Sequence, residues 1–204
     1  MPADFTLRDY ADCLAAVIDA VGLGPAHVGG LSWGGMVAQQ LHHSHPEMVR
    51  TLLLIDPYAG WGGSLPEEER RVRVEGLRRA LEAPPEEFDA TFPGLFAAGP
   101  PARFASLLAE IAADVRPQTF RILLRMADLD LSDQLRRIHV PTLLVWGELD
   151  ARSPLTVARQ FQDAIPHAQL VVIPGAGQVS HLEQPKRFNE AVRAFCRAHS
   201  ARAP

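Results

Sequence analysis

Apolar positions recur at helical spacing near the start of the chain. The spacing is three or four residues through Leu7, Tyr10, Leu14, Val17, Ile18 and Val21, and it ends at Gly22. Ahead of this run, Thr6 and Asp9 have the spacing of a capping box, in which each side chain accepts from the other residue's backbone N–H. The pattern predicts one amphipathic helix that begins after Thr6 and stops before Gly22.

Four short runs farther along are apolar nearly throughout, at residues 26–30, 51–55, 142–146 and 169–173. They lack the in-and-out alternation of a half-exposed strand, which is typical of strands that helices cover on both faces. Helical signals lie between and after them, including the Ser153-Pro154 helix start. We therefore expect an α/β fold, with a mostly parallel sheet and helices on both faces.

A long segment, residues 60–137, separates the second and third of these runs. It is rich in Pro, Ala, Leu and Arg, and its helical spacing is broken at Pro84-Pro85 and Pro117. We expect a helical lid here, inserted into a core of residues 1–59 and 138–204. Its apolar side chains either line an acyl pocket or form the core of the lid itself: Phe92, Leu95, Phe96, Phe104, Leu107 and Leu108.

Composition excludes several classes of function. A chain of 204 residues that is 47% apolar and 22% charged can bury one sizeable core. The net charge is −4, and the 20 basic residues are scattered among 24 acidic ones, which argues against a nucleic-acid partner. No apolar run reaches the roughly 18 residues of a membrane span, and the first ten residues lack the layout of a signal peptide. We expect a soluble cytoplasmic protein without a membrane partner.

Metal and cofactor sites are not indicated. Cys13 and Cys196 are far apart and outside any C-x-x-C spacing, so we expect two buried thiols rather than a disulfide or zinc site. His42, His43 and His45 cluster before Pro46, but no carboxylate or cysteine in the same segment completes a metal site, and we interpret them as a solvated helix end. We expect neither a metal nor an organic cofactor.

The motif that carries chemistry is Gly30-Leu31-Ser32-Trp33-Gly34, which matches G-x-S-x-G. It lies between the first predicted strand and a predicted helix at 35–44, the context of a nucleophile elbow, where a strained turn exposes the serine hydroxyl. The glycines at positions 29, 30, 34 and 35 supply the space for the turn. The Trp33 N–H is aimed where an oxyanion would form. The alternative is an ordinary glycine-rich turn between strand and helix.

From these residues the chain resembles the α/β-hydrolase fold family, in particular its lidded esterases and enol-lactonases, over essentially its whole length. The segment 141–150, Pro-Thr-Leu-Leu-Val-Trp-Gly-Glu-Leu-Asp, looks like the strand and turn that end in the family's triad acid. The resemblance implies that Asp150 orients a base, and the order Ser, Asp, His fits this fold. Asp150 could otherwise be a turn or cap residue ahead of Ser153.

The chain departs from the family pattern where the base is expected. The family has a stretch similar to G-x-G-H followed by E-x-P, and here Gln178 stands at the histidine position, judged from Glu183 and Pro185. An amide cannot accept the serine proton near neutral pH. His181 lies three residues later and would share a helical face with Gln178. It is either a replacement base or a packing residue beside an impaired site.

A second departure lies ahead of the elbow, where the family has several further strands and this chain has only a helix. The resemblance implies an N-terminally truncated fold that lacks the other oxyanion donor. The strand at 26–30 would then be an open edge, and such edges recruit partners. We expect a homodimer or a larger homo-oligomer that covers this edge.

These features favour a serine hydrolase that cleaves carboxylic esters or lactones of small apolar acyl groups through an acyl-enzyme intermediate. Ser32 is the nucleophile, Asp150 the acid, His181 the best available base and the Trp33 N–H the oxyanion donor. Its partner would be a small-molecule ester or lactone. The alternative is a catalytically impaired, hydrolase-like module that binds a ligand or a protein, and the supporting feature is Gln178 at the expected histidine position.

Overall fold

The four predicted strands form one parallel sheet in the order β1-β2-β3-β4. The computed structural model describes residues 5–83, 93–114 and 117–200. The strands are β1 (Ala26–Leu31), β2 (Val49–Ile55), β3 (Thr142–Gly147) and β4 (Gln169–Ile173). Each contains the run that the sequence predicted and extends it by two residues at most. Because all strands run in one direction, their carboxyl ends meet along one edge of the sheet.

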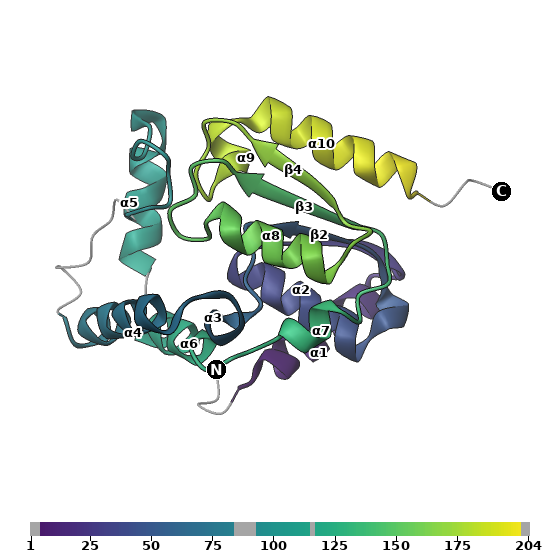
Figure 1. Ribbon diagram of the computed structural model, residues 1–204, viewed down its shortest axis with the longest axis horizontal. Coiled ribbons are helices and arrows are strands. Elements are labelled where there is room, and N and C mark those ends of the chain that lie inside the picture. Colours follow the sequence, from purple (N-terminus) through teal and green to yellow (C-terminus); the bar gives the residue numbers. More distant parts are fainter. Residues whose placement is uncertain (1–4, 84–92, 115–116, 201–204) are drawn as a thin grey trace.

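Helices precede, separate and follow the strands (Figure 1). They are α1 (Leu7–Ala20), α2 (Trp33–Ser44), α3 (Gly60–Ser64), α4 (Glu67–Glu82), α5 (Ala105–Asp114), α6 (Pro117–Met126), α7 (Ser132–Leu135), α8 (Leu155–Ala164), α9 (Ser180–Glu183) and α10 (Pro185–Ala198), with 3₁₀ turns η1 (Pro46–Met48) and η3 (Ala102–Phe104). The capping box is confirmed, because Thr6 caps α1 and exchanges hydrogen bonds with Asp9.

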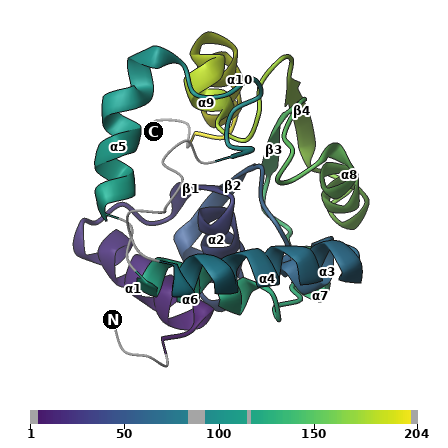
Figure 2. The same ribbon diagram turned by 90° about the vertical axis from the view of Figure 1, so that its left-hand side faces the viewer.

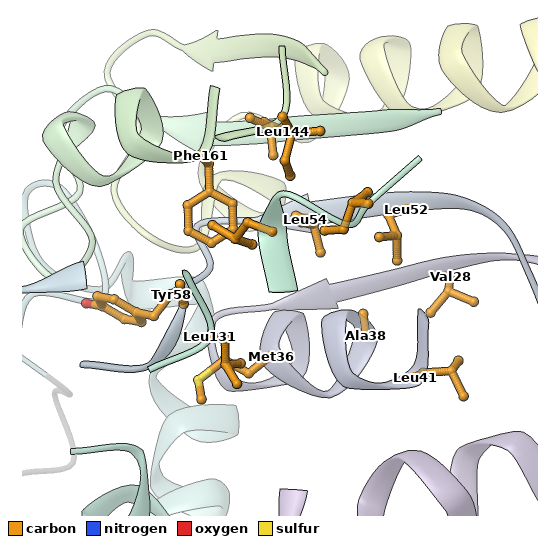
Figure 3. Packing of buried hydrophobic residues seen from close by; sticks show 14 of the residues in the cluster. Val28, Met36, Ala38, Leu41, Leu52, Leu54, Tyr58, Leu131, Leu144 and Phe161 are labelled. Carbon is orange, nitrogen blue, oxygen red and sulfur yellow. The ribbon is translucent and has the colours of Figure 1, made fainter. Parts of the chain in front are cut away.

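Both faces of the sheet are covered. Figure 3 shows one side, where Leu52, Leu54 and Leu144 of the strands meet Met36 of α2 and Phe161 of α8. On the other side α10 covers β3 and β4, and Phe195 packs with the strand residues of that face: Leu53, Leu143, Val145 and Ile173. Alternate residues of one strand thus enter opposite cores, which explains why the runs are apolar without alternation.

Helix α1 packs on α2 with a face that matches the predicted one only in part. Ile18 is buried and Leu7 and Leu14 pack against the core, as predicted, whereas Val17 and Val21 are 57% and 58% exposed. Ala11 and Ala15 are also buried, because small side chains allow the two helices to approach closely. The same geometry leaves Cys13 exposed, so the expectation of two buried thiols was wrong; both cysteines are free.

The segment between β2 and β3 carries α3 to α7. In Figure 2, α4, α6, α3 and α7 lie together below the sheet, and α5 stands apart from them beside the sheet. Phe96 and Leu108 of this segment are buried with Val179, and Leu31, Leu95, Phe104 and Leu182 pack around them. Leu107 is 46% exposed, and Phe92 lies outside the described residues. This apolar cluster therefore joins the inserted segment to the loops at the carboxyl ends of β1 and β4.

Among the described residues, none of the helices combines the length and the apolar character needed to span a bilayer. Strand β1 lies at one edge of the sheet and pairs with β2 only, within the part of the chain that the structure describes. The homo-oligomer expected from this edge stays a prediction, and light scattering at micromolar protein concentration would measure it.

Candidate active site

Ser32 occupies a strained turn between β1 and α2. Its backbone has φ 51° and ψ −114°, a conformation that non-glycine residues rarely adopt and that costs about 1–3 kcal/mol. The Ser32 N–H donates to the carbonyl of Ile55 at 2.8 Å, and the Gly35 N–H donates to the Ser32 carbonyl at 2.9 Å. These two hydrogen bonds hold the turn between strand and helix. The side chain is half-buried, and its hydroxyl makes no hydrogen bond with the described residues.

Only two of the four glycines around the turn are needed for space. A Cβ atom on Gly30 would lie 2.1 Å from the Gly34 carbonyl oxygen, and one on Gly35 would lie 2.8 Å from Cβ of Pro57. A Cβ on Gly34 would meet nothing within 4 Å, and one on Gly29 would make only ordinary contacts. The prediction that all four supply space was therefore wrong for Gly29 and Gly34, because their Cβ positions face away from the crossing backbone.

Trp33 is the first residue of α2, so its N–H has no acceptor within the helix and is available to a ligand. The indole ring packs edge-on against Tyr10 of α1, with ring centroids 4.6 Å apart. Tyr10 in turn packs edge-on against Phe5. The ring thus anchors the start of α2 to α1.

Asp150 lies in the turn after β3 and is 5% exposed. Its Oδ1 accepts from the backbone N–H groups of Arg152 at 2.7 Å and Ser153 at 3.0 Å. Ser153 itself donates through Oγ to the Pro57 carbonyl at 3.0 Å. The other oxygen, Asp150 Oδ2, is buried and has no hydrogen-bond partner among the described residues. One oxygen of the acid is therefore fixed by the backbone, and the second is unused.

Asp56, which sequence reasoning missed, lies at the end of β2 between the strands that lead to Ser32 and Asp150. It is fully buried, has φ 43°, and accepts from the Gly147 N–H through Oδ1 at 2.9 Å. Burial and the nearby Asp150 carboxylate raise the pKa of Asp56 to about 9. Burial also raises the pKa of Asp150, against the lowering effect of its backbone hydrogen bonds. Two buried carboxyls therefore face each other beside the elbow.

Gln178 follows β4 and is almost fully buried, at 3% exposure. Its turn packs backbone to backbone on the turn that carries Asp150, here called the acid turn. A Cβ on Gly147 would lie only 2.0 Å from the Gly177 carbonyl oxygen. The Leu149 N–H also donates to the Ala176 carbonyl at 2.8 Å. The position expected for a histidine thus lies beside the Asp150 turn. The Gln178 amide makes no hydrogen bond with the described residues.

His181 lies on α9, and its ring packs against Phe188 of α10 at a centroid distance of 5.7 Å. The imidazole makes no hydrogen bond with the described residues, including Ser32 and Asp150. Desolvation by burial lowers the pKa of His181, and none of the carboxylates among the described residues opposes this effect. The structure therefore brings Ser32, Asp56, Asp150 and Gln178 to one edge of the sheet, whereas His181 is directed to the helix beside it.

The inserted segment is tied to these loops by a second set of hydrogen bonds. Glu183 accepts from the Ala97 N–H at 2.9 Å and from the Gly177 N–H at 2.7 Å. The Arg152 guanidinium donates twice to the Pro93 carbonyl, at 2.8 and 3.0 Å. A Cβ on Gly177 would lie 2.7 Å from the Ala97 nitrogen. The chain at residues 93–97 thus lies directly on the loops that follow β3 and β4.

Helix α4 also contacts the acid turn, through Arg73. Arg73 donates to the Tyr58 hydroxyl at 2.8 Å and to the Arg152 carbonyl at 2.7 Å, and it pairs with Glu69 at 2.5 Å. The Tyr58 hydroxyl donates to the same Arg152 carbonyl. Burial raises the pKa of Tyr58 to about 12, so the phenol remains a donor at neutral pH.

The described residues contain no group of three or more His, Cys, Asp and Glu side chains arranged to hold a metal ion. The expectation of a solvated cluster at the end of α2 holds for one of its three histidines. His43 is exposed, whereas His42 is 8% exposed and the half-buried His45 hydrogen-bonds to Asp12 of α1 at 2.6 Å.

The sequence profile described as "Alpha/beta hydrolase family" matches residues 1–191. The chain belongs to this family. RutD of Pseudomonas syringae pv. syringae, whose name gives its activity provisionally as carbamate hydrolysis, is 30% identical over 96% of this α/β hydrolase and 76% of its own length. The pimeloyl-(acyl-carrier protein) methyl ester esterase of Chromobacterium violaceum is 28% identical over 91% of this chain and 75% of its own length.

Solved structures agree with the fold of this α/β hydrolase. A thermophilic esterase from Thermogutta terrifontis superposes with a TM-score of 0.79 at 29% identity, over 98% of this chain and 75% of that one. This chain thus spans about three quarters of the length of these relatives. Its relatives hydrolyse esters or carbamates by name, which places the chain among the hydrolases of the family.

Proposed function

We propose that this α/β hydrolase cleaves carboxylic esters or lactones of small apolar acyl groups through an acyl-enzyme intermediate on Ser32. The observation that carries the proposal is the strained backbone of Ser32 at the carboxyl end of β1, where the hydroxyl makes no hydrogen bond within the part of the chain that the structure describes. Such strain persists only where the surrounding structure enforces it and is typical of functional sites. Esterase relatives that match nearly the whole chain support the same reaction class.

In the first step, Ser32 Oγ attacks the acyl carbon, and the bond from that carbon to the alcohol oxygen breaks. The serine proton passes through a base to the departing alcohol. Water then attacks the acyl-serine, and the carboxylic acid leaves with Ser32 restored. The Trp33 N–H stabilises the oxyanion in both steps, and Asp150 supports the base.

The base of this mechanism must come from a residue that follows β4. His181 is the imidazole that follows β4, and in this role its ring would leave Phe188 and turn toward Asp150. Gln178 holds the position beside the acid turn but cannot accept a proton. We therefore expect slow hydrolysis in the parent protein, with a rate that a histidine at position 178 would raise.

The size of the acyl group follows from the cluster around Phe96, Leu108 and Val179. This cluster includes Leu31, which precedes the nucleophile, and Leu182, which follows the expected base. Its members are bulky and leave an apolar wall beside the site. We infer that short, apolar acyl groups fit better than long or charged ones, and that residues 60–137 act as a lid.

The test is hydrolysis of p-nitrophenyl acetate and butyrate by the parent and by S32A, Q178H and H181F. We expect activity in the parent that S32A abolishes and that Q178H raises about 100-fold or more, the scale of general-base catalysis. S200A, at an exposed serine near the end of α10, is the matched control and should leave the rate unchanged. Loss of activity in H181F assigns the base to His181, and unchanged activity excludes it.

A second candidate function is a hydrolase-like module that binds a ligand without turnover. The observation in its favour is that the expected base position is an amide while the nearby imidazole packs on Phe188. In that case the parent and S32A have the same rate, and activity arises only in Q178H. Equal rates for all variants, at the level of buffer, would contradict the proposed reaction altogether.

A further inference from the structure

The proposed mechanism gives no role to the carboxyl of Asp56. It follows β2, the strand between the one that leads to Ser32 and the one that leads to Asp150. Its N–H donates to the Val145 carbonyl at 2.9 Å, so the residue continues the ladder toward β3. Its positive φ of 43° turns the chain out of the strand, and its side chain is fully buried. A buried aspartate in a strained conformation is costly and needs a physical reason.

The hydrogen bonds of the two carboxyls leave one oxygen on each unused. Asp56 Oδ1 accepts from the Gly147 N–H at 2.9 Å, and Asp150 Oδ1 accepts from two backbone N–H groups. Asp56 Oδ2 and Asp150 Oδ2 are both buried and have no partner among the described residues. Two acceptors cannot bond to each other, so a proton on one of them would satisfy both.

The surroundings decide which carboxyl holds the proton. Asp150 accepts two backbone N–H groups, and the positive charge of Arg152 lies nearby, both of which favour the charged form. Asp56 accepts only one N–H and also faces the negative charge of Glu183. Burial adds to this difference and raises the pKa of Asp56 far above its ordinary value. The Tyr58 hydroxyl donates to the Arg152 carbonyl and accepts from Arg73, so its proton goes to neither carboxyl.

We propose that Asp56 is a positioning residue for the acid: its carboxyl stays protonated at neutral pH and donates a hydrogen bond to Asp150. Asp150 then remains ionised, with one oxygen held by backbone N–H groups and the other by the Asp56 hydroxyl. A base that enters beside Asp150 must share this second oxygen with Asp56. The proposal extends the proposed function, since Asp150 is the acid there, but the shared proton can be measured without substrate.

Infrared spectroscopy tests the proton directly, because a protonated carboxylic acid absorbs apart from carboxylates and shifts in D₂O. We expect one such band in the parent at pH 7, its loss above about pH 10, and its absence in D56N at pH 7. The D130N variant removes an exposed aspartate that hydrogen bonds from Ser132 keep ionised, and should retain the band. The catalytically dead S32A should also retain it, which separates this proposal from the proposed function.

The pH dependence of the urea unfolding midpoint is a second test, because an Asp56 with only a structural role would not change it. Because the folded pKa of Asp56 lies above its unfolded value near 3.9, the folded state binds the extra proton between about pH 4 and 9. The contribution of the Asp56 proton to stability is therefore fully present below pH 4 and declines as pH rises toward 9. We expect D56N, which keeps a neutral donor, to flatten this decline, and D56L, which has no donor, to lower the midpoint throughout.

An absent acid band in the parent at pH 7 would overturn the proposal, even if D56N does not fold. So would a D56N variant that keeps the band, or one that keeps the full decline of the urea midpoint with pH.

Discussion

Gly30 and Gly34 cross so closely at the elbow that a Cβ atom on Gly30 would lie 2.1 Å from the Gly34 carbonyl oxygen. The contact is one-sided, because a Cβ on Gly34 would meet nothing within 4 Å. Both glycines belong to the same G-x-S-x-G motif, yet only the first is required by the packing of the turn. This asymmetry gives a matched pair of substitutions.

The G30A variant should lose on the order of 3 kcal/mol of unfolding free energy, because backbone atoms cannot move aside as a flexible side chain can. The G34A variant should be neutral or gain up to about 1 kcal/mol, since alanine favours the first turn of α2. Urea denaturation followed by circular dichroism measures both. Equal losses in the two variants would contradict the geometry of the elbow.

Arg73 and Arg71 offer a second matched pair on α4. Arg73 binds the Tyr58 hydroxyl and the Arg152 carbonyl, whereas Arg71 is exposed and forms its ion pair with the exposed Glu68. We expect R73A to lower the unfolding free energy by about 2 kcal/mol, the scale of charged hydrogen bonds to partly buried groups. R71A should have no measurable effect, because exposed ion pairs are screened. A thermal melt that ranks R71A below R73A would count against this prediction.

Glu183 is expected to hold the chain near Ala97 on the loop near Gly177. In E183Q one carboxylate oxygen becomes an NH₂ group that faces a backbone N–H, so at least one hydrogen bond is lost. We expect a loss of about 1–3 kcal/mol and faster amide exchange at both backbone positions. E190Q, at an exposed residue of α10, is the control and should change neither. Unchanged exchange at Ala97 in E183Q would refute the assigned contact.

His181 should titrate below the ordinary histidine value near 6.5, because burial against Phe188 disfavours the imidazolium. The unfolded chain then binds more protons than the folded one as pH falls below 6.5. The contribution of the neutral His181 ring to stability is present above that pH and is lost on acidification through the folded pKa. H181F keeps a ring beside Phe188 and should remove part of this acid loss.

An NMR titration of the His181 ring protons measures the same property directly. A midpoint above 6.5 would mean that the ring pairs with a carboxylate instead of Phe188, as a base supported by Asp150 would. This measurement therefore also distinguishes a base from a packing residue at position 181, and it requires no substrate.

The sequence predicts the sheet and the elbow well because their signals are local. The runs at residues 26–30 and 142–146 carry their own strand signal, and the motif around Ser32 lies at a strand end where its turn is expected. The face of α1 was predicted less well. Periodicity located Ile18, which is buried, but it missed Ala11 and Ala15, because alanine gives no strong signal of a core position.

The partners of the site residues could not be predicted, because they are brought together across the sheet. Asp56 follows a strand as a turn residue would, and nothing nearby in sequence shows that its carboxyl faces Asp150, 94 positions later. The same holds for Glu183 and Ala97. The position of Asp56 at a strand's carboxyl end was the one available signal, since parallel strands align those ends.

Arg152 is hydrogen-bonded to the inserted segment at both ends: its carbonyl accepts from Arg73, and its guanidinium donates to the Pro93 carbonyl. Its backbone N–H, in turn, fixes an oxygen of Asp150. Displacement of the insert would therefore also loosen the turn that holds Asp150. The order of the insert and the order of that turn are coupled through this one residue.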